Sequence, residues 1–154
     1  MDSALSQEQA QNRTVEVLGR SLSVLPSGTR LDVENPTYPQ SDLPRGGFGP
    51  CYDDNTIDYG PHRFDAGYWV VGNGVHRANL DLLLASWGEW GWTVEDESKD
   101  GGKRASATTP DGYRVSAELG TPEYLSVVGV SPCFEIEAGQ TPPAGVAPRA
   151  IEQR

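Results

Sequence analysis

The chain has 154 residues and a formal net charge of −10, and 36% of its residues are apolar. This length fits one domain with tails, and the lack of a basic patch excludes nucleic acid as a partner, since binding to phosphates requires one. The same charge disfavours anionic lipid surfaces, and no stretch has the roughly 18–20 continuous apolar residues that a transmembrane helix requires.

Residues 6–25 have the pattern of an amphipathic helix. Ser6 and Gln9 have the spacing of a capping box, in which each side chain accepts a hydrogen bond from the backbone of the other residue. Four apolar residues then fall on one face at helical spacing: Val15, Leu18, Leu22 and Leu25. The turn-forming sequence at residues 26–28 ends the helix, and a short strand is expected at residues 29–35.

Residues 36–62 predict a long irregular loop, because glycine and proline recur through most of it. A loop of this length inside a compact domain is usually functional or tied to the rest of the fold, and Cys51 supplies a tether near its middle. The carboxylates Asp53, Asp54 and Asp58 do not fit a calcium loop, which requires glycine at the sixth position. We expect them to be solvated or, as an alternative, to contribute to a partner-binding surface.

The second half of the chain predicts a strand, a helix and four further strands. Residues 63–72 are extended, and residues 74–91 have the wide apolar face of a helix, with Asn73 as a candidate N-cap and Gly91 at the end. The apolar period then changes to two. The four further strands, joined by tight turns, are expected at residues 92–98, 104–109, 113–119 and 124–131.

These elements predict an α+β fold with two layers. An antiparallel sheet of about five strands, ending in a C-terminal meander, packs the two helices on one of its faces. We expect residues 1–137 to form this single domain, with residues 36–62 as a loop within it. Residues 138–154 are expected to be a flexible, proline-rich tail.

The two cysteines are Cys51 in the long loop and Cys133 after the last predicted strand. A disulfide between them would close a long loop, which the chain-entropy model values at about 4–5 kcal/mol. Neither cysteine has a CxxC partner or a histidine within a few residues, features that often accompany reactive thiols. We predict a structural disulfide, with a reactive thiol or two unpaired buried cysteines as the alternatives.

Three of the four tryptophans, Trp87, Trp90 and Trp92, fall at the end of the predicted second helix, and Trp69 lies in a predicted strand. The simplest interpretation places all four in the core, because large rings bury the most area per residue. The alternative is an exposed aromatic platform that binds a glycan, a peptide or a protein.

Motifs for catalysis are missing from the sequence. His62 and His76 are the only histidines, no G-x-S-x-G motif is present, and the glycine pairs lack the context of a phosphate-binding loop. We expect no enzymatic activity, no metal and no cofactor. A cell-wall hydrolase that uses one of the histidines is the enzymatic alternative.

The arrangement resembles the LppA-type lipoprotein family of mycobacteria and related actinobacteria. The residues that carry the resemblance are Cys51, the pair Cys133-Phe134 and the sequence at residues 138–143. The resemblance implies export, a lipid anchor on an N-terminal cysteine and an oxidised Cys51–Cys133 bridge. No such anchoring cysteine is found at the start of this sequence, and the family supplies no catalytic residues.

We therefore expect an exported domain of the cell envelope, on the extracytoplasmic face or secreted, with a non-enzymatic binding or accessory role. Its partner would be an envelope protein or a wall component, and it would contact the membrane only through a lipid anchor that this sequence lacks. The alternative is an immunity or exclusion lipoprotein of a prophage, which would bind a phage or toxin protein.

Overall fold

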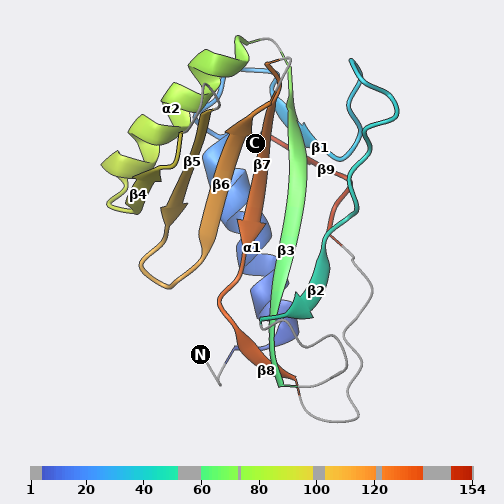
Figure 1. The fold of residues 1–154 in the computed structure, drawn as a ribbon, viewed down its shortest axis with the longest axis vertical. Helices are drawn as coiled ribbons and strands as arrows, with labels where there is room; N and C mark the ends of the chain where they lie inside the picture. Colours follow the sequence, from blue (N-terminus) through green and yellow to red (C-terminus); the bar gives the residue numbers. More distant parts are fainter. Residues whose placement is uncertain are drawn as a thin grey trace.

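The computed structural model describes residues 5–51, 60–72, 74–98, 103–120, 123–136 and 147–153 (Figure 1). Asp53, Asp54, Asp58 and Asn73 lie outside these residues. The described part contains the helices α1 (Gln7–Leu22) and α2 (His76–Glu89), neither of which is long and apolar enough to cross a membrane. It also contains nine strands: β1 (Arg30–Asp32), β2 (Gly47–Pro50), β3 (Gly60–Val71), β4 (Thr93–Asp96), β5 (Lys103–Thr108), β6 (Arg114–Leu119), β7 (Leu125–Val130), β8 (Phe134–Ile136) and β9 (Ala150–Glu152).

The described strands form one antiparallel sheet, whose main path runs β4-β5-β6-β7-β3-β1-β9. β3 is long enough to take two partners on each side, with β7 and β8 on one and β1 and β2 on the other. The α+β class and the meander from β4 to β7 are confirmed, but the sheet is larger than the predicted five strands. The sheet also takes in β1, which lies within the short strand expected at residues 29–35. The unexpected strands β2, β8 and β9 have only three or four residues each, which is too short to show a period in the sequence.

Both helices pack on one face of the sheet, as predicted, and Figure 1 views the sheet from the opposite face, with α1 behind it. Alternate residues of β3 point toward the helices and are buried: Phe64, Ala66, Tyr68 and Val70. α1 approaches the sheet closely at Gly129 in β7, where an added Cβ would lie 2.9 Å from Thr14 Cγ2 and 3.0 Å from Leu18 Cγ. Glycine at this position therefore sets the distance between the two layers.

The predicted capping box begins α1. Gln9 N donates to Ser6 Oγ at 3.1 Å, and Ser6 N donates to Gln9 Oε1 at 2.9 Å. The helix ends at Leu22, three residues before the predicted end. Its C-terminal carbonyls are satisfied from the far end of the chain, because Gln153 Nε2 donates to the main-chain oxygens of Leu22 at 3.1 Å and Leu25 at 2.9 Å.

The predicted flexible tail is wrong for residues 147–153, which dock on the domain. Ala147 is fully buried, and its N–H donates to the carbonyl oxygen of Arg45 at 3.0 Å. The Tyr68 hydroxyl donates to the oxygen of Pro148 at 2.8 Å, and β9 pairs with β1. These contacts are long-range, so they leave no mark in the composition or local period of the segment.

The predicted irregular loop at residues 36–62 is also partly wrong. Gly47–Pro50 forms β2, and the loop's last three residues belong to β3, whose His62 lies opposite Pro50. Pro50 is tolerated because β2 has one strand partner among the described residues, β3, and a proline needs no partner for a missing N–H at a sheet edge. Residues 52–59 lie outside the described part.

The predicted disulfide is confirmed. Cys51 follows β2 and Cys133 precedes β8, and their sulfur atoms are bonded at 2.09 Å with the Cα atoms 6.3 Å apart. β2 and β8 pair with neighbouring residues on opposite sides of β3. The disulfide therefore joins both flanks of β3 at its beginning, and neither cysteine is a free thiol.

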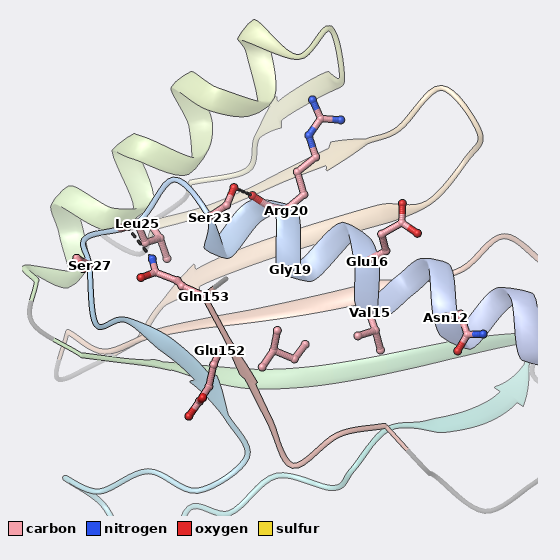
Figure 2. Close-up of a pocket in the computed structure, with 11 residues that line it drawn as sticks. Asn12, Val15, Glu16, Gly19, Arg20, Ser23, Leu25, Ser27, Glu152 and Gln153 are labelled. Atoms are coloured by element: carbon pink, nitrogen blue, oxygen red, sulfur yellow. Dashed lines mark hydrogen bonds between the residues drawn. The ribbon is translucent and has the colours of Figure 1, made fainter.

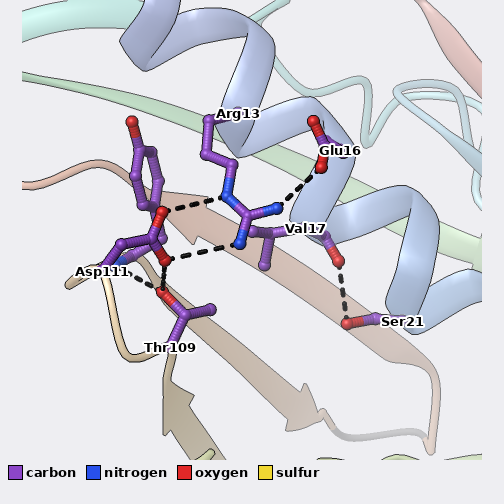
Figure 3. Close-up of polar contacts among 7 residues, drawn as sticks. Arg13, Glu16, Val17, Ser21, Thr109 and Asp111 are labelled. Atoms are coloured by element: carbon purple, nitrogen blue, oxygen red, sulfur yellow. Dashed lines mark hydrogen bonds and ion pairs between the residues drawn. The ribbon is translucent and has the colours of Figure 1, made fainter. Parts of the chain in front are cut away.

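A polar contact fixes α1 to the turn between β5 and β6 (Figure 3). Arg13 Nε donates to Asp111 Oδ2 at 3.1 Å, and its Nη1 donates to Glu16 at 2.7 Å. The Thr109 hydroxyl donates to Asp111 Oδ1 at 2.6 Å. Burial raises the pKa of Asp111, but the hydrogen bonds from Arg13 and Thr109 and the charge of Arg13 outweigh it, so this pKa lies below its usual value.

Candidate binding groove

The structure does not gather the four tryptophans into one exposed surface. Trp87 is fully buried, and its Nε1 donates to Ser21 Oγ at 3.0 Å. Trp92 is 6% exposed and packs edge-on against Trp90, with ring centroids 4.9 Å apart. Trp69 points to the other face of the sheet, because alternate β3 side chains point to opposite faces.

The two histidines lie near opposite ends of β3. His62 is buried, with its Nδ1 3.0 Å from the carbonyl oxygen of Gly60. His76 begins α2, and its Nδ1 accepts a hydrogen bond from Leu125 N at 3.2 Å. Burial lowers the pKa of His76, and the charge of Glu123 offsets this only in part. The described residues contain no group of three or more His, Cys, Asp or Glu side chains that could hold a metal ion.

The face of the sheet that neither helix covers carries a regular grid of side chains across β5, β6, β7 and β3. The register aligns a middle row of small residues, Ser106, Ser116, Val128 and Gly67. The rows on either side are longer and more polar; one contains Thr108, Arg114, Val130 and Asp65, and the other contains Arg104, Glu118, Ser126 and Trp69. A row of small side chains between two rows of larger ones forms a depression that runs across the strands.

Two adjoining hollows follow this depression and share Ser126 and Val128. One, of about 260 Å³, is lined on its charged side by Arg63, Arg104 and Arg114. The other, of about 510 Å³, extends over β3 to Leu43, Gly47, Phe48 and Trp69. Because they share a wall, we describe them together as the open-face groove, with an arginine end and an apolar end.

The arginine end carries more positive than negative charge, although the chain as a whole is strongly acidic. Arg104 and Arg114 both pair with Glu97, at 3.3 Å and 2.5 Å, so two cations share one carboxylate. The Arg63 side chain is exposed and makes no hydrogen bond or ion pair with another described side chain, and its charge acts on Asp65. Glu118 lies opposite Arg104 in the sheet register.

The apolar end is held by the segment that precedes β2. Trp69 Nε1 donates to the oxygen of Ser41 at 2.7 Å, and Leu43 N donates to the oxygen of Val33 at 2.8 Å. Tyr124 packs edge-on against Trp69, with ring centroids 5.6 Å apart. The apolar wall is therefore fixed by hydrogen bonds and ring packing.

Asp65 lies between the two ends of the groove. Burial raises the pKa of its carboxyl group, and the charge of Arg63 opposes this shift.

A larger hollow, of about 670 Å³, lies between α1 and β9 (Figure 2). In Figure 2, Arg20 and Glu16 extend upward from α1 and Glu152 points downward from β9, so the charged groups of the hollow do not converge. Gln153, on its wall, is occupied by hydrogen bonds to the backbone after α1. This hollow accompanies the docking of β9 and presents no constellation for binding or chemistry.

Of the groove residues, Trp69 was named from the sequence and the others were missed, although one signal in β7 could have found part of them. β7 buries Leu125 and Val127 against the helices, yet the opposite face also carries the aliphatic residues Val128 and Val130. A strand with apolar residues on both faces predicts either a second covering layer or a binding surface. The arginines gave no such signal, because they come from β3, β5 and β6 and converge only through the sheet register.

No family model, curated protein or solved structure matches this chain. The resemblance to LppA-type lipoproteins therefore stays a prediction from the sequence.

Proposed function

We propose that this protein is a non-enzymatic binding domain of an extracytoplasmic compartment, and that the open-face groove is its binding surface. The observation that carries the proposal is the exposure of Val128. Its side chain is 40% exposed on β7, in the middle of the sheet, where both helices lie on the other side. An aliphatic residue at the floor of a groove on a central strand gains from being covered by a partner.

The Cys51–Cys133 disulfide supports the proposed location, because disulfides form and persist in oxidising compartments and are rare in the reducing cytosol. The resemblance to LppA-type lipoproteins points the same way, toward the cell envelope or secretion. In that setting a lipid anchor on a preceding segment would tether the domain to the membrane, and the partner would be an envelope protein or a wall component.

The binding surface is tested by site-specific photo-crosslinking in intact cells. A photoreactive phenylalanine analogue replaces Val128 in one variant and Leu82 in the control, because Leu82 on α2 is equally exposed, at 41%, but lies away from the groove. We expect a discrete adduct only from position 128. Equal adducts from both positions, or none from position 128, would contradict the assignment of the groove.

The location is tested separately by the oxidation state of the cysteines in the cells that express the protein. Acid quenching followed by alkylation separates oxidised from reduced chains. We expect both cysteines to be protected from alkylation until a reductant is added. Free thiols in freshly quenched cells would argue for the cytosol and against export, without bearing on the groove.

A further inference from the structure

We propose that the open-face groove binds an extended peptide segment of a partner protein that carries a carboxylate at one end and an aliphatic side chain at the other. The inference rests on the proposed function, since it names the class of ligand for the same groove. It follows from the charges, the apolar wall and the length of the groove.

The arginine end fits the carboxylate. Val130 on β7 lies opposite Arg114 on β6 and opposite Asp65 on β3. Arg63 is two residues before Asp65 on the same face of β3, so Arg63 and Arg114 lie on either side of Val130. A guanidinium can bind a carboxylate through two parallel hydrogen bonds. The Arg63 side chain makes no hydrogen bond or ion pair to another described residue, although its charge acts on Asp65, so a ligand carboxylate can pair with it without breaking an ion pair among the described residues.

The apolar end fits an aliphatic side chain. Val128 forms the floor where the two hollows meet, and Leu43 and Trp69 form the wall beyond it. Trp69 is itself fixed by its hydrogen bond to the oxygen of Ser41 at 2.7 Å and by its ring contact with Tyr124 at a centroid distance of 5.6 Å. An apolar side chain of the ligand would therefore pack against a wall that is already in place, which reduces the conformational entropy lost on binding.

The length of the groove and its glycine margin favour a peptide. From β5 to β2 the groove crosses four strand spacings of about 4.8 Å, or roughly 19 Å, which is the reach of about six extended residues. Gly47 and Gly49 line its edge, and an added Cβ at either would meet no described atom within 4 Å. Glycine within a strand often marks a site where another backbone approaches closely, and a bound peptide would provide that backbone.

Charge also argues against a second copy of this chain and against nucleic acid as the occupant. Two copies, each with a formal charge of −10, repel each other. Nucleic acid would need a basic surface much larger than three arginines, one of which lies opposite Glu118. An acidic segment of a partner is attracted by the arginine end alone, so the rest of the acidic surface restricts it to this groove.

The test uses the oxidised full chain and a synthetic array of octapeptides. Each peptide carries two glutamates and two leucines on a serine background, with the distance between the two pairs varied, and matched sets replace the glutamates with glutamine or lysine. We expect binding only when the pairs are separated enough to span the groove. We also expect about a tenfold or greater loss of affinity with glutamine, and a further loss with lysine.

Variants assign the two ends. Arg63→Glu should weaken the glutamate peptides about tenfold or more and improve the lysine set, whereas Lys103→Glu makes the same charge change on the helix-facing side of β5 and should change neither. Gly47→Val should block the apolar end and keep the fold, because its side chain enters open space. Circular dichroism and the disulfide state confirm that each variant is folded.

Two results would overturn the peptide assignment. If no octapeptide binds at millimolar concentration, or if glutamate, glutamine and lysine sets bind equally, the ligand class is wrong. The proposed surface is judged separately, from any peptide that does bind. Binding lost in Val128→Glu but kept in Leu82→Glu supports the groove whatever the charge preference, and binding unaffected by Val128→Glu rejects the groove itself.

Discussion

The side-chain amide of Gln153 donates to the main-chain oxygen of Leu25 at 2.9 Å, although 128 residues separate them along the chain. The same nitrogen also reaches the oxygens of Leu22 and Pro26, and the Gln153 oxygen accepts from Gly28 N at 3.2 Å. A residue near the end of the chain thus satisfies the backbone groups that α1 and the following turn leave open.

Gln153→Glu should destabilise the protein by about 1–3 kcal/mol, because the replacement keeps the size but faces carbonyl oxygens with a carboxylate that cannot donate. Urea unfolding followed by tryptophan fluorescence measures the change. Glu152→Gln, on the same strand, is the control and should lie within about 0.5 kcal/mol of the unaltered protein. Equal stability of the two variants would show that the Gln153 hydrogen bonds contribute little.

Replacing both cysteines by serine should lower the free energy of unfolding by about 4–5 kcal/mol on the chain-entropy model, since Cys51 and Cys133 are 82 residues apart. The oxidised protein should have a mass about 2 Da below that of the reduced protein. Reduction of the unaltered protein is the matched control and should reproduce the loss. A reduced protein as stable as the oxidised one would contradict the expected stabilisation.

Gly129→Ala should destabilise the protein by about 1–3 kcal/mol through overpacking, because the new methyl group lies within 3.0 Å of Thr14 and Leu18 on α1. Gly47→Ala supplies the comparison, since the same methyl group there meets no described atom within 4 Å. Thermal unfolding of both variants tests the difference. If Gly129→Ala has the same melting temperature as Gly47→Ala, α1 adjusts to the sheet more freely than the contact implies.

His76 should make stability depend on pH. Burial lowers its pKa in the folded protein, so between that value and the unfolded pKa of about 6.5 the unfolded chain binds more protons. The contribution of His76 is therefore complete above about pH 6.5 and is lost as the pH falls toward the lowered folded value. Protonation also removes the Nδ1 lone pair that accepts from Leu125 N.

The measurement is urea unfolding at pH 7.5 and pH 5.5. His76→Asn keeps a side-chain acceptor and does not titrate, so its stability should change less between these two values than that of the unaltered protein. An equal change in both proteins would assign the pH dependence to other groups, such as the carboxylates.

The sequence predicted the parts of the fold whose information is local. The capping box of Ser6 and Gln9, the termination of α2 before Gly91 and the meander of β4 to β7 each depend on residues within one element or turn. The disulfide was also predicted, because a two-cysteine chain has one possible intramolecular pairing.

The sequence could not predict the docking of β9 or the open-face groove. Gln153 and Ala147 are stabilised by residues more than 100 positions away, and neither has a distinctive local pattern. The groove depends on the register that brings Gly67, Val128 and Ser116 side by side, and a shift of one residue in any strand would turn that strand's groove residue to the helix side. The four tryptophans suggested one aromatic surface, but the sheet separates them, since Trp87 and Trp92 are in the core and Trp69 lies on the face away from the helices.

The docking of β9 has a consequence for the order in which the protein folds. α1, near the start of the chain, is completed by Ile151 and Gln153, and β1 also takes its outer partner from that segment. Nascent chains that lack these last residues would leave the end of α1 and the edge of β1 unsatisfied. Folding of this domain is therefore expected to wait until residues 147–153 have been synthesised and can reach α1 and β1.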